Sequence, residues 1–393
     1  MEKVYLTEEQ CCGCTACANA CPKQAITMQE DKKGFLYPVI DSEKCIDCGL
    51  CVRACRHSER LYQKEEPSAI YAVQHSNKSV VKESSSGGAF TLISDLILAQ
   101  GGEVFGCVID ENFHVLHVSA KTAAERDRMR GSKYVQSDLG NVYAEIKQAC
   151  KNHPVLFVGT PCQVGGLYSY LGKIPENLVT MDFICHGTPS QKIFQEHIRF
   201  LEKKYRKQAS SYKFRDKKYG WRHVETVFFK DGSQKSSYAV FGIKHFFGQN
   251  INLRPACYAC PYTTVSREAD ITIGDFWGAE RILNRYENKG ISLLMVNNQK
   301  GEALFGKITK DHVVRQIEVK DAMQRAMQKP APKSKQTQAF WALYEKEGYE
   351  GVVRKYRPSR WKHILRFGFV ALTVRLGLDA TINKIKAKIR GRK

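Results

Sequence analysis

Apolar and polar residues follow two different periods between residues 69 and 300, and this mixture predicts strands alternating with helices. Four short apolar runs have the length and β-branched composition of buried strands: 69–74, 103–109, 155–159 and 179–185. Residues 88–100 instead place Phe90, Ile93 and Ile97 on one side of a helix. We therefore expect a mixed α/β domain in this part of the chain.

The spacing of these runs also predicts hairpins and exposed loops. Residues 114–119 follow the run at 103–109 closely, and Asp231-Gly232 follows an apolar run at 224–230, as in a tight two-strand turn. The runs at 155–159 and 179–185 each end in a loop that carries a cysteine and leads into a helical stretch. Those two loops are candidate positions for a site.

Length and charge limit the class of protein. The 393 residues, 43% of them hydrophobic, suffice for two or three domains with buried cores, which excludes disorder of the whole chain. The net charge of +21 is uneven, because residues 352–393 hold 13 Lys or Arg against one Asp. This uneven charge argues against a whole surface built for nucleic acid. Residues 1–10 lack the apolar run of a signal peptide, so we expect a cytoplasmic protein.

Eight of the 15 cysteines form an internal repeat, and each half has the spacing C-x2-C-x2-C-x3-C. The first half is Cys11, Cys14, Cys17 and Cys21, and the second is Cys45, Cys48, Cys51 and Cys55. In two-cluster ferredoxins the fourth cysteine of each run binds the other cluster. We therefore predict two 4Fe-4S clusters, one held by Cys11, Cys14, Cys17 and Cys55, the other by Cys45, Cys48, Cys51 and Cys21. A zinc ribbon, the alternative, needs four cysteines and leaves both x3 steps unexplained.

Two details of this repeat depart from the pattern. Arg56 follows Cys55, where the first half has Pro22 after its fourth cysteine. Cys12 lies outside the spacing, and we expect it to take no part in either cluster.

Four more cysteines sit in unusual loops: Cys162 in Gly-Thr-Pro-Cys-Gln, Cys185 in Cys-His-Gly, and the pair Cys257 and Cys260 before Pro261. Four thiolates could hold a third 4Fe-4S cluster. Zinc would accept the same four ligands, and two separated redox or structural thiols are a further interpretation. Cys107 and Cys150 lie in apolar or helical surroundings and are expected to be packing residues.

A loop rich in serine and glycine, residues 84–88, precedes the predicted helix at 88–100. Free amides at a helix N-terminus suit a phosphate or pyrophosphate, although a simple serine cap with turn glycines explains the same residues. The segment 130–134 (Arg-Gly-Ser-Lys-Tyr) adds cations that could bind the same anion. Neither G-x-G-x-x-G nor G-x-x-x-x-G-K-[ST] occurs, so a Rossmann nicotinamide site and a P-loop both lose their main support.

Taken in order, these motifs resemble the coenzyme F420 hydrogenase/dehydrogenase beta-subunit family over roughly residues 5–320, behind an N-terminal two-cluster ferredoxin domain. The resemblance rests on 85–88 (Ser-Ser-Gly-Gly), 131–134 (Gly-Ser-Lys-Tyr), 159–163, 185–187, the Cys257–Cys260 pair and 269–278 (Ala-Asp-Ile-Thr-Ile-Gly-Asp-Phe-Trp-Gly). Related proteins occur among hydrogenase and formate dehydrogenase subunits, a plant chlorophyll-cycle reductase and bacterial polysaccharide biosynthesis genes.

The resemblance implies FAD and an iron-sulfur flavoprotein oxidoreductase that couples single electrons from the clusters to hydride chemistry, with a role in polysaccharide biosynthesis as one setting. The alternative is a non-catalytic subunit that delivers electrons to a partner enzyme. Expected partners are a redox protein, such as ferredoxin or another oxidoreductase subunit, and a small-molecule substrate. Flavin suits this role because it joins one-electron and two-electron reactions.

Within that scheme, Ser86, Gly87, Gly88 and Lys133 are candidate FAD contacts. His186 is the candidate proton donor near the flavin, because its ordinary pKa lies near neutrality; a supporting hydrogen bond is the alternative role. Asp275 could bind ribose or orient a ligand, or it could cap a helix.

The basic tail mixes cations with apolar residues. Residues 364–378 include Arg366 and Arg375 and are too short and too charged to span a bilayer. Peripheral contact with the inner membrane face, docking on protein, and nucleic-acid binding are three interpretations, with nucleic acid the least favoured.

The predicted fold is thus an α+β ferredoxin-like two-cluster domain (1–64), a mixed α/β flavin-binding oxidoreductase domain (69–325) and a basic helical C-terminal extension (326–393).

Overall fold

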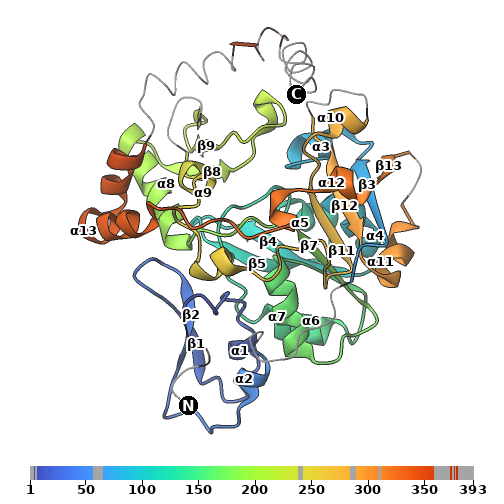
Figure 1. The fold of residues 1–393 in the computed structure, drawn as a ribbon, viewed down its shortest axis with the longest axis horizontal. Helices are drawn as coiled ribbons and strands as arrows, with labels where there is room; N and C mark the ends of the chain where they lie inside the picture. The colour runs from blue at the N-terminus through green and yellow to red at the C-terminus, as the bar shows by residue number, and fades with distance from the viewer. Residues whose placement is uncertain are drawn as a thin grey trace.

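A computed structural model describes residues 4, 7–55, 65–237, 242–283, 289–308, 311–357, 372–373, 376 and 378. The N-terminal domain lies at one end of the molecule, beside helices of the large domain (Figure 1). It contains an antiparallel pair, β1 (Ile26–Glu30) and β2 (Leu36–Ile40), and two four-residue helices, α1 (Ala16–Asn19) and α2 (Leu50–Arg53). The two halves of the cysteine repeat fold alike, because each short helix carries the third cysteine of its run.

The large domain is built on an eight-stranded mixed sheet. Its strand order is β13 (Val313–Ile317), β3 (Ala69–Gln74), β12 (Ser292–Val296), β11 (Ile271–Asp275), β7 (Leu178–Phe183), β6 (Val155–Val158), β4 (Glu103–Ile109) and β5 (Val115–Ala120). The central strands β4, β6, β7 and β11 run parallel. Their carboxyl ends therefore meet at one edge, where open α/β sheets bind ligands.

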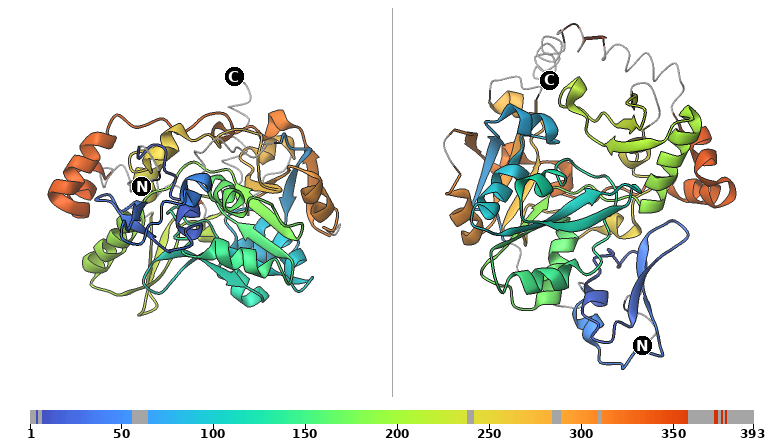
Figure 2. Two further views of the ribbon diagram at one scale, coloured as in Figure 1. Left: turned by 90° about the horizontal axis from the view of Figure 1, so that it is seen from below. Right: turned by 180° about the vertical axis from the view of Figure 1, so that it is seen from behind.

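Helices cover both faces of this sheet, as the views in Figure 2 show. Alternate residues of β12 separate the two cores: Leu294 packs toward α4 (Ala89–Leu98) and α11 (Gln299–Phe305), whereas Leu293 belongs to a core on the opposite side. On that opposite side α6 (Val142–Ala149) and α7 (Pro161–Leu171) pack on β4, β6 and β7. This alternation is the two-residue period of a strand buried on both faces.

Shorter helices complete the sheet domain. They are α3 (Lys78–Glu83), α5 (Ala123–Asp127), α10 (Ala279–Ile282) and α12 (Val319–Ala322), with the single 3-10 turns η2 (Pro255–Ala259) and η3 (Arg325–Met327).

A second lobe surrounds a three-stranded antiparallel sheet of β8 (Ala209–Lys213), β9 (Thr226–Phe229) and β10 (Gln234–Ser236). Three helices, α8 (Gln191–Tyr205), α9 (Lys244–Gly248) and α13 (Thr337–Tyr356), contribute to its aromatic core, and η1 (Lys217–Tyr219) connects β8 to β9. Phe35 of the N-terminal domain joins the same core, 6.1 Å from Trp341 between ring centroids. The two domains are thus packed together through buried aromatic side chains.

The predicted mixed α/β sheet domain and the ferredoxin-like N-terminal domain are both present. The strands predicted at 69–74 and 103–109 match β3 and β4, and the helix predicted over 88–100 is α4. Both hairpins form, as β4–β5 and β9–β10.

The C-terminal tail is described only in part. Most of residues 358–393 lie outside the described residues, and the tail interpretations stay predictions. Residues 337–356, which the sequence placed in the extension, bury Phe340 and Trp341 in the core of the second lobe. In the described part of the chain, no helix is both long enough and apolar enough to cross a membrane.

Candidate functional site

A cavity of about 1100 Å³ opens at the carboxyl ends of the parallel strands. Its walls include the residues that directly follow β6, the residues that follow β7, and Asp275 at the end of β11. This volume is at the upper end of ligand pockets, so the cavity can take a group as large as a dinucleotide. Apart from Gly87, every candidate residue that the sequence placed in the large domain lines it.

The structure brings the four cysteines of the proposed third site together at this cavity. Cys162 lies in the first turn of α7, Cys185 follows β7, and Cys257 and Cys260 are in and just after the η2 turn. Cys185 is close enough to Cys257 and Cys260 for their charges to interact, and Cys162 is related in the same way to Cys260. Burial raises the pKa of the Cys185 thiol, so free thiols here would be neutral.

A fifth cysteine also lines this cavity. Cys12, which we expect to take no part in either N-terminal cluster, lies within hydrogen-bonding reach of the Cys162 and Cys14 thiols. The contact with Cys162 depends on how the two domains pack, which spacing along the chain does not report. The expected role of Cys12 stays a prediction.

A buried cation faces this group of thiols. The Arg267 guanidinium is 1% exposed, and among the described residues none of its three nitrogens has a hydrogen-bond partner. Its nearest acid is Asp182, at 3.7 Å, and its charge also reaches Cys185 and Cys260. Arg267 does not line the cavity, and the buried Asp182 carboxylate is the partner of its charge.

Two cysteines of the N-terminal domain, Cys17 and Cys51, have neighbours from both halves of the repeat. Cys17 is close enough to Cys11 and Cys55 for their charges to interact, and Cys51 is related in the same way to Cys21 and Cys48. The last cysteine of each run therefore lies near the other run, although the assignment of ligands stays a prediction. Cys48 is exposed, whereas Cys17 is buried.

Within residues 7–55, 65–237, 242–283, 289–308 and 311–357, no three Cys, His, Asp or Glu side chains converge closely enough to share one metal ion.

Arg254 joins the N-terminal domain to the large domain at this point. The side chain is buried, and its Nε donates to the Cys11 carbonyl at 2.7 Å and its Nη1 to Gln136 Oε1 at 2.9 Å. Nη2 donates to the Leu36 carbonyl at 2.9 Å and lies 3.6 Å from the Cys11 sulfur. The guanidinium also lies 4.4 Å from the ring centroid of Tyr37. Arg254 thus links the first cysteine loop to the segment of the large domain that carries Cys257.

The serine-glycine loop is held against the sheet. Ser86 Oγ donates to the Ile291 carbonyl at 2.7 Å, and the Gly87 amide donates to Ser292 Oγ at 2.8 Å. A side chain at Gly87 would lie 2.6 Å from the Ser292 nitrogen, so the glycine is needed for close packing. Gly87 itself does not line the cavity, whereas Ser86 and Gly88 do.

The N-terminus of α4 is open toward the cavity. Its N-cap is Gly88, at φ 93°, and no side chain caps the helix, so the expected alternative of a serine cap is wrong. Gly88, Ala89 and Phe90 line the cavity, and Arg130 stands near them, with its Nε 3.1 Å from Thr91 Oγ1. Uncapped amides beside a cation are suited to an anion.

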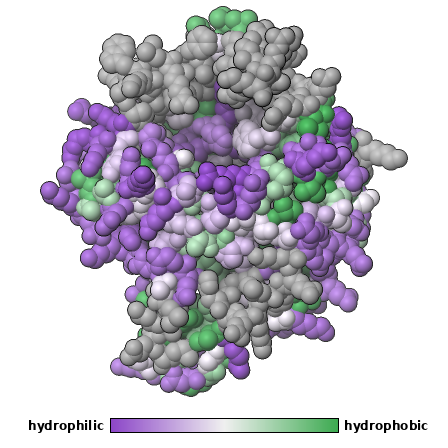
Figure 3. Space-filling view, in the orientation of Figure 1, coloured by the Kyte–Doolittle hydropathy of each residue, from purple (hydrophilic) through white to green (hydrophobic). Residues whose placement is uncertain are grey.

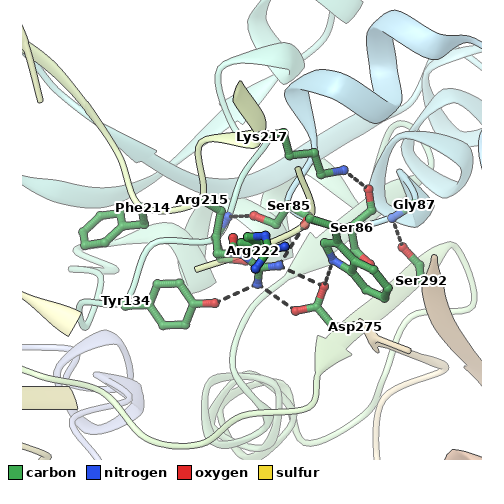
Figure 4. A network of polar contacts seen from close by, with 12 residues as sticks. Ser85, Ser86, Gly87, Tyr134, Phe214, Arg215, Lys217, Arg222, Asp275 and Ser292 are labelled. Carbon is green, nitrogen blue, oxygen red and sulfur yellow. Dashed lines mark hydrogen bonds and ion pairs between the residues drawn. The ribbon is translucent and has the colours of Figure 1, made fainter. Parts of the chain in front are cut away.

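Asp275 is already paired, which the sequence did not show. Arg215 Nη1 lies 2.7 Å from its Oδ2, and Trp221 Nε1 donates to Oδ1 at 2.8 Å. Figure 4 shows this network, in which Arg215 also contacts Tyr134 and the Ser85 carbonyl. Burial acts to raise the pKa of Asp275, but the charge and hydrogen bond of Arg215, together with Trp221 and His223, hold this pKa below its ordinary value.

That pairing limits the roles expected for Asp275. The nearest helix, α10, has Gly278 as its N-cap, so Asp275 does not cap it. We infer that Asp275, which lines the cavity, anchors Arg215 and Trp221 behind the cavity wall.

Lys133 and His186 also face the cavity. Lys133 Nζ donates to the Met129 carbonyl at 2.7 Å, and burial lowers its pKa to about 8. His186 Nε2 is 2.6 Å from Asn250 Oδ1, and its ring packs against Phe247. This hydrogen bond fixes the orientation of the imidazole. Cys107, expected to be a packing residue, lines the cavity as well.

Comparisons with known proteins agree with this organisation. Residues 10–58 match the model of the 4Fe-4S dicluster domain, and residues 153–322 match that of the C terminus of the coenzyme F420 hydrogenase/dehydrogenase beta subunit. No curated protein shows detectable similarity to the chain. Among solved structures, the chain is similar to one from the F420-reducing [NiFe] hydrogenase complex of Methanosarcina barkeri, obtained by xenon derivatization. That match has 15% identity and a TM-score of 0.44 and covers 75% of this chain and 94% of the other.

The dicluster domain and its cysteine spacing define an iron-sulfur electron-transfer protein of the oxidoreductase class. The large domain carries, over residues 153–322, the C-terminal domain of the coenzyme F420 hydrogenase/dehydrogenase beta subunit.

Proposed function

We propose that this protein is an iron-sulfur flavoprotein oxidoreductase that carries three 4Fe-4S clusters and one FAD. The observation that carries the proposal is that a single cavity is lined both by the cysteines of the third site and by the uncapped N-terminus of α4. When bound, the clusters would supply single electrons and the flavin would exchange electron pairs with a substrate.

The N-terminal domain would receive the electrons. Cys48 is exposed to solvent, whereas Cys14 lies against Gly166 of α7 in the large domain. The set Cys45, Cys48, Cys51 and Cys21 is therefore the outer one. Ile46, within that loop, is 58% exposed, and Val52 is 38% exposed. Figure 3 shows apolar atoms on the surface of this end of the molecule. Apolar residues beside an exposed cluster site favour docking of a redox protein here.

The large domain would hold the FAD. The amides of Gly88 and Ala89, with the Arg130 side chain, are positioned for a pyrophosphate. Charged side chains on the cavity wall are mostly cationic: Arg130, Lys133, Arg254 and Arg325 stand against Glu9 and Asp275. An excess of positive charge suits a ligand with two phosphates.

His186 would hold the proton that accompanies the transfer of an electron pair between flavin and substrate. Its Nε2 is oriented by Asn250, which leaves Nδ1 as the other titratable atom of a ring that faces the cavity. A histidine is suited to this role because its ordinary pKa lies near neutral pH. The substrate class follows only from the family resemblance: a small organic compound or a sugar-linked intermediate.

Flavin occupancy in two lysine variants tests the proposal. Lys133→Met removes a cation that faces the cavity. Lys300→Met is the matched control, because Lys300 Nζ also donates to a backbone carbonyl, at 2.9 Å, but lies outside the cavity. After anaerobic purification, we expect FAD in the wild type and in Lys300→Met, and on the order of tenfold weaker FAD binding in Lys133→Met, the loss expected for one charge-assisted contact.

The results that would contradict the proposal are also defined. A wild-type protein that neither retains nor binds added FAD would exclude the flavoprotein and favour the electron-transfer subunit. If FAD binds but is reoxidised only by a partner protein, the chain is a conduit for electrons rather than an enzyme by itself.

A further inference from the structure

One lysine of the second lobe holds the serine-glycine loop of the sheet domain. Lys217, in η1, donates from its Nζ to the carbonyls of Val81, Ser86 and Lys289, at 2.6, 2.5 and 2.5 Å. Figure 4 shows the contact with Ser86. An ammonium group has three protons, and three carbonyls can accept all of them. Lys217 thus joins the second lobe to the loop that precedes α4.

The neighbouring carbonyls of the loop are held in the same way. Arg215 Nη2 donates to the Ser85 carbonyl at 3.2 Å. The His75 amide donates to the Gly87 carbonyl at 2.8 Å. Arg215, His75 and Lys217 do not line the cavity. Three successive carbonyls of the loop are therefore bound by groups that lie behind the cavity wall.

The backbone amides that follow these carbonyls face the other way. In a planar trans peptide the carbonyl and the next N–H point in opposite directions, so a carbonyl bound from behind turns the next amide toward the cavity. Ser86 and Gly88 supply two such amides, and both residues line the cavity. In the part of the chain that the structure describes, neither amide has an acceptor. The amide between them, that of Gly87, donates to Ser292 Oγ at 2.8 Å.

This orientation is the one that a bound anion needs. Backbone amides bind phosphate oxygens, whereas a carbonyl turned toward the phosphate would repel it. The two glycines would let these peptides rotate, because glycine accepts positive and negative φ, and Gly88 is already at φ 93°. The donors behind the loop therefore select the orientation with its amides toward the cavity.

We propose that Lys217 is a positioning residue for the pyrophosphate of FAD. It holds the Ser86 carbonyl behind the cavity wall, so that the amides of Ser86 and Gly88 face the phosphates. This inference rests on the FAD site proposed above. It makes the second lobe part of that site, although Lys217 itself does not line the cavity.

Two lysine variants and two flavins test this role. Lys217→Met removes the ammonium group that holds the loop. Lys213→Met is the matched control, because Lys213, at the end of β8, also joins the second lobe to the sheet domain: its Nζ lies 2.7 Å from Glu83 Oε2. Dissociation constants would be measured by flavin fluorescence on the flavin-free, full-length protein. The ligands are FAD and riboflavin, which has the same ring system and no phosphate.

We expect FAD to bind about tenfold more weakly to Lys217→Met, because part of the binding free energy must then order the loop. Riboflavin should bind equally well to the wild type and to both variants, and Lys213→Met should bind FAD as the wild type does. If Lys217→Met does not fold, Lys217→Arg takes its place. Arginine keeps the charge but not the three contacts of the ammonium group, so a weaker affinity for FAD alone is again expected.

Three results would overturn the inference and leave the flavoprotein intact. An unchanged affinity for FAD in Lys217→Met would show that the loop needs no support from the second lobe. An equal loss for riboflavin would place the damage in the ring site or in the fold. An equal loss in Lys213→Met would show that any contact between the lobes is enough. A wild type that binds no FAD would instead refute the proposed function, and this inference with it.

Discussion

Replacing Arg254 by methionine would remove the buried cation between the first cysteine loop and the third site. Its Nη2 atom lies 3.6 Å from the Cys11 sulfur, and the side chain is 1% exposed. A cation beside a cluster stabilises the reduced form, because reduction adds negative charge. We therefore expect the reduction potential of the cluster bound by Cys11 to fall in Arg254→Met.

The size of this fall follows from Coulomb's law. Two unit charges about 4 Å apart interact by about 4 kcal/mol at an effective dielectric constant of about 20. The added electron spreads over the whole cluster. Only roughly a third of that energy, about 1.4 kcal/mol, would therefore change the free energy of reduction of the cluster. For a one-electron couple this is a tenfold change in equilibrium, or about 59 mV.

A redox titration followed by electron paramagnetic resonance would measure the shift. Arg254→Lys keeps the charge and should retain most of the potential, although it loses the fork that binds three backbone and side-chain acceptors. Arg53→Met is the control, because Arg53 is exposed on α2, where solvent screens its charge. An unchanged potential in Arg254→Met, or an equal fall in Arg254→Lys, would refute the electrostatic role.

Three further predictions concern the large domain. Gly87→Ala should lower the free energy of unfolding by at least about 2 kcal/mol, because the new methyl group meets backbone atoms of β3 and β12. A lower melting temperature would show this loss. Gly248→Ala is the control and should leave the melting temperature unchanged, because open space surrounds Gly248. Burial lowers the pKa of His117 from 6.5 to about 4, so the folded state resists protonation of this side chain. The free energy of unfolding should therefore fall by up to about 3 kcal/mol as the pH falls from 6.5 to 4. His117→Gln, which does not titrate, should show a smaller fall in melting temperature between pH 7 and 5. His186→Gln should keep iron and flavin but slow flavin reoxidation by substrate by about 100-fold, measured by stopped flow, and an unchanged rate would exclude it as the proton donor.

The sequence predicted those features of the structure that depend on neighbouring residues, such as cysteine spacing and apolar strands. The x2 and x3 spacings fix which cysteines share a loop, and the apolar run of β3 is long enough and β-branched enough to be recognised as a strand. Both depend on residues within a few positions of one another.

The remaining features depend on contacts between distant segments. Arg215 meets Asp275 across 60 positions, and Arg254 meets Cys11 across 243. The position of Cys12 beside Cys162 and Cys260 could not be predicted for the same reason, since these two cysteines come from the other domain. One signal was available in the sequence: a cysteine outside a cluster spacing, next to a ligand, is a reactive group that needs its own explanation.

The most direct test of the proposed function is the cofactor content of the protein purified without oxygen. Iron, zinc and flavin would be quantified, and absorption spectra recorded before and after dithionite. The account predicts about twelve irons and one FAD per chain, both bleached on reduction. About eight irons without flavin, or zinc in place of the last four irons, would contradict it.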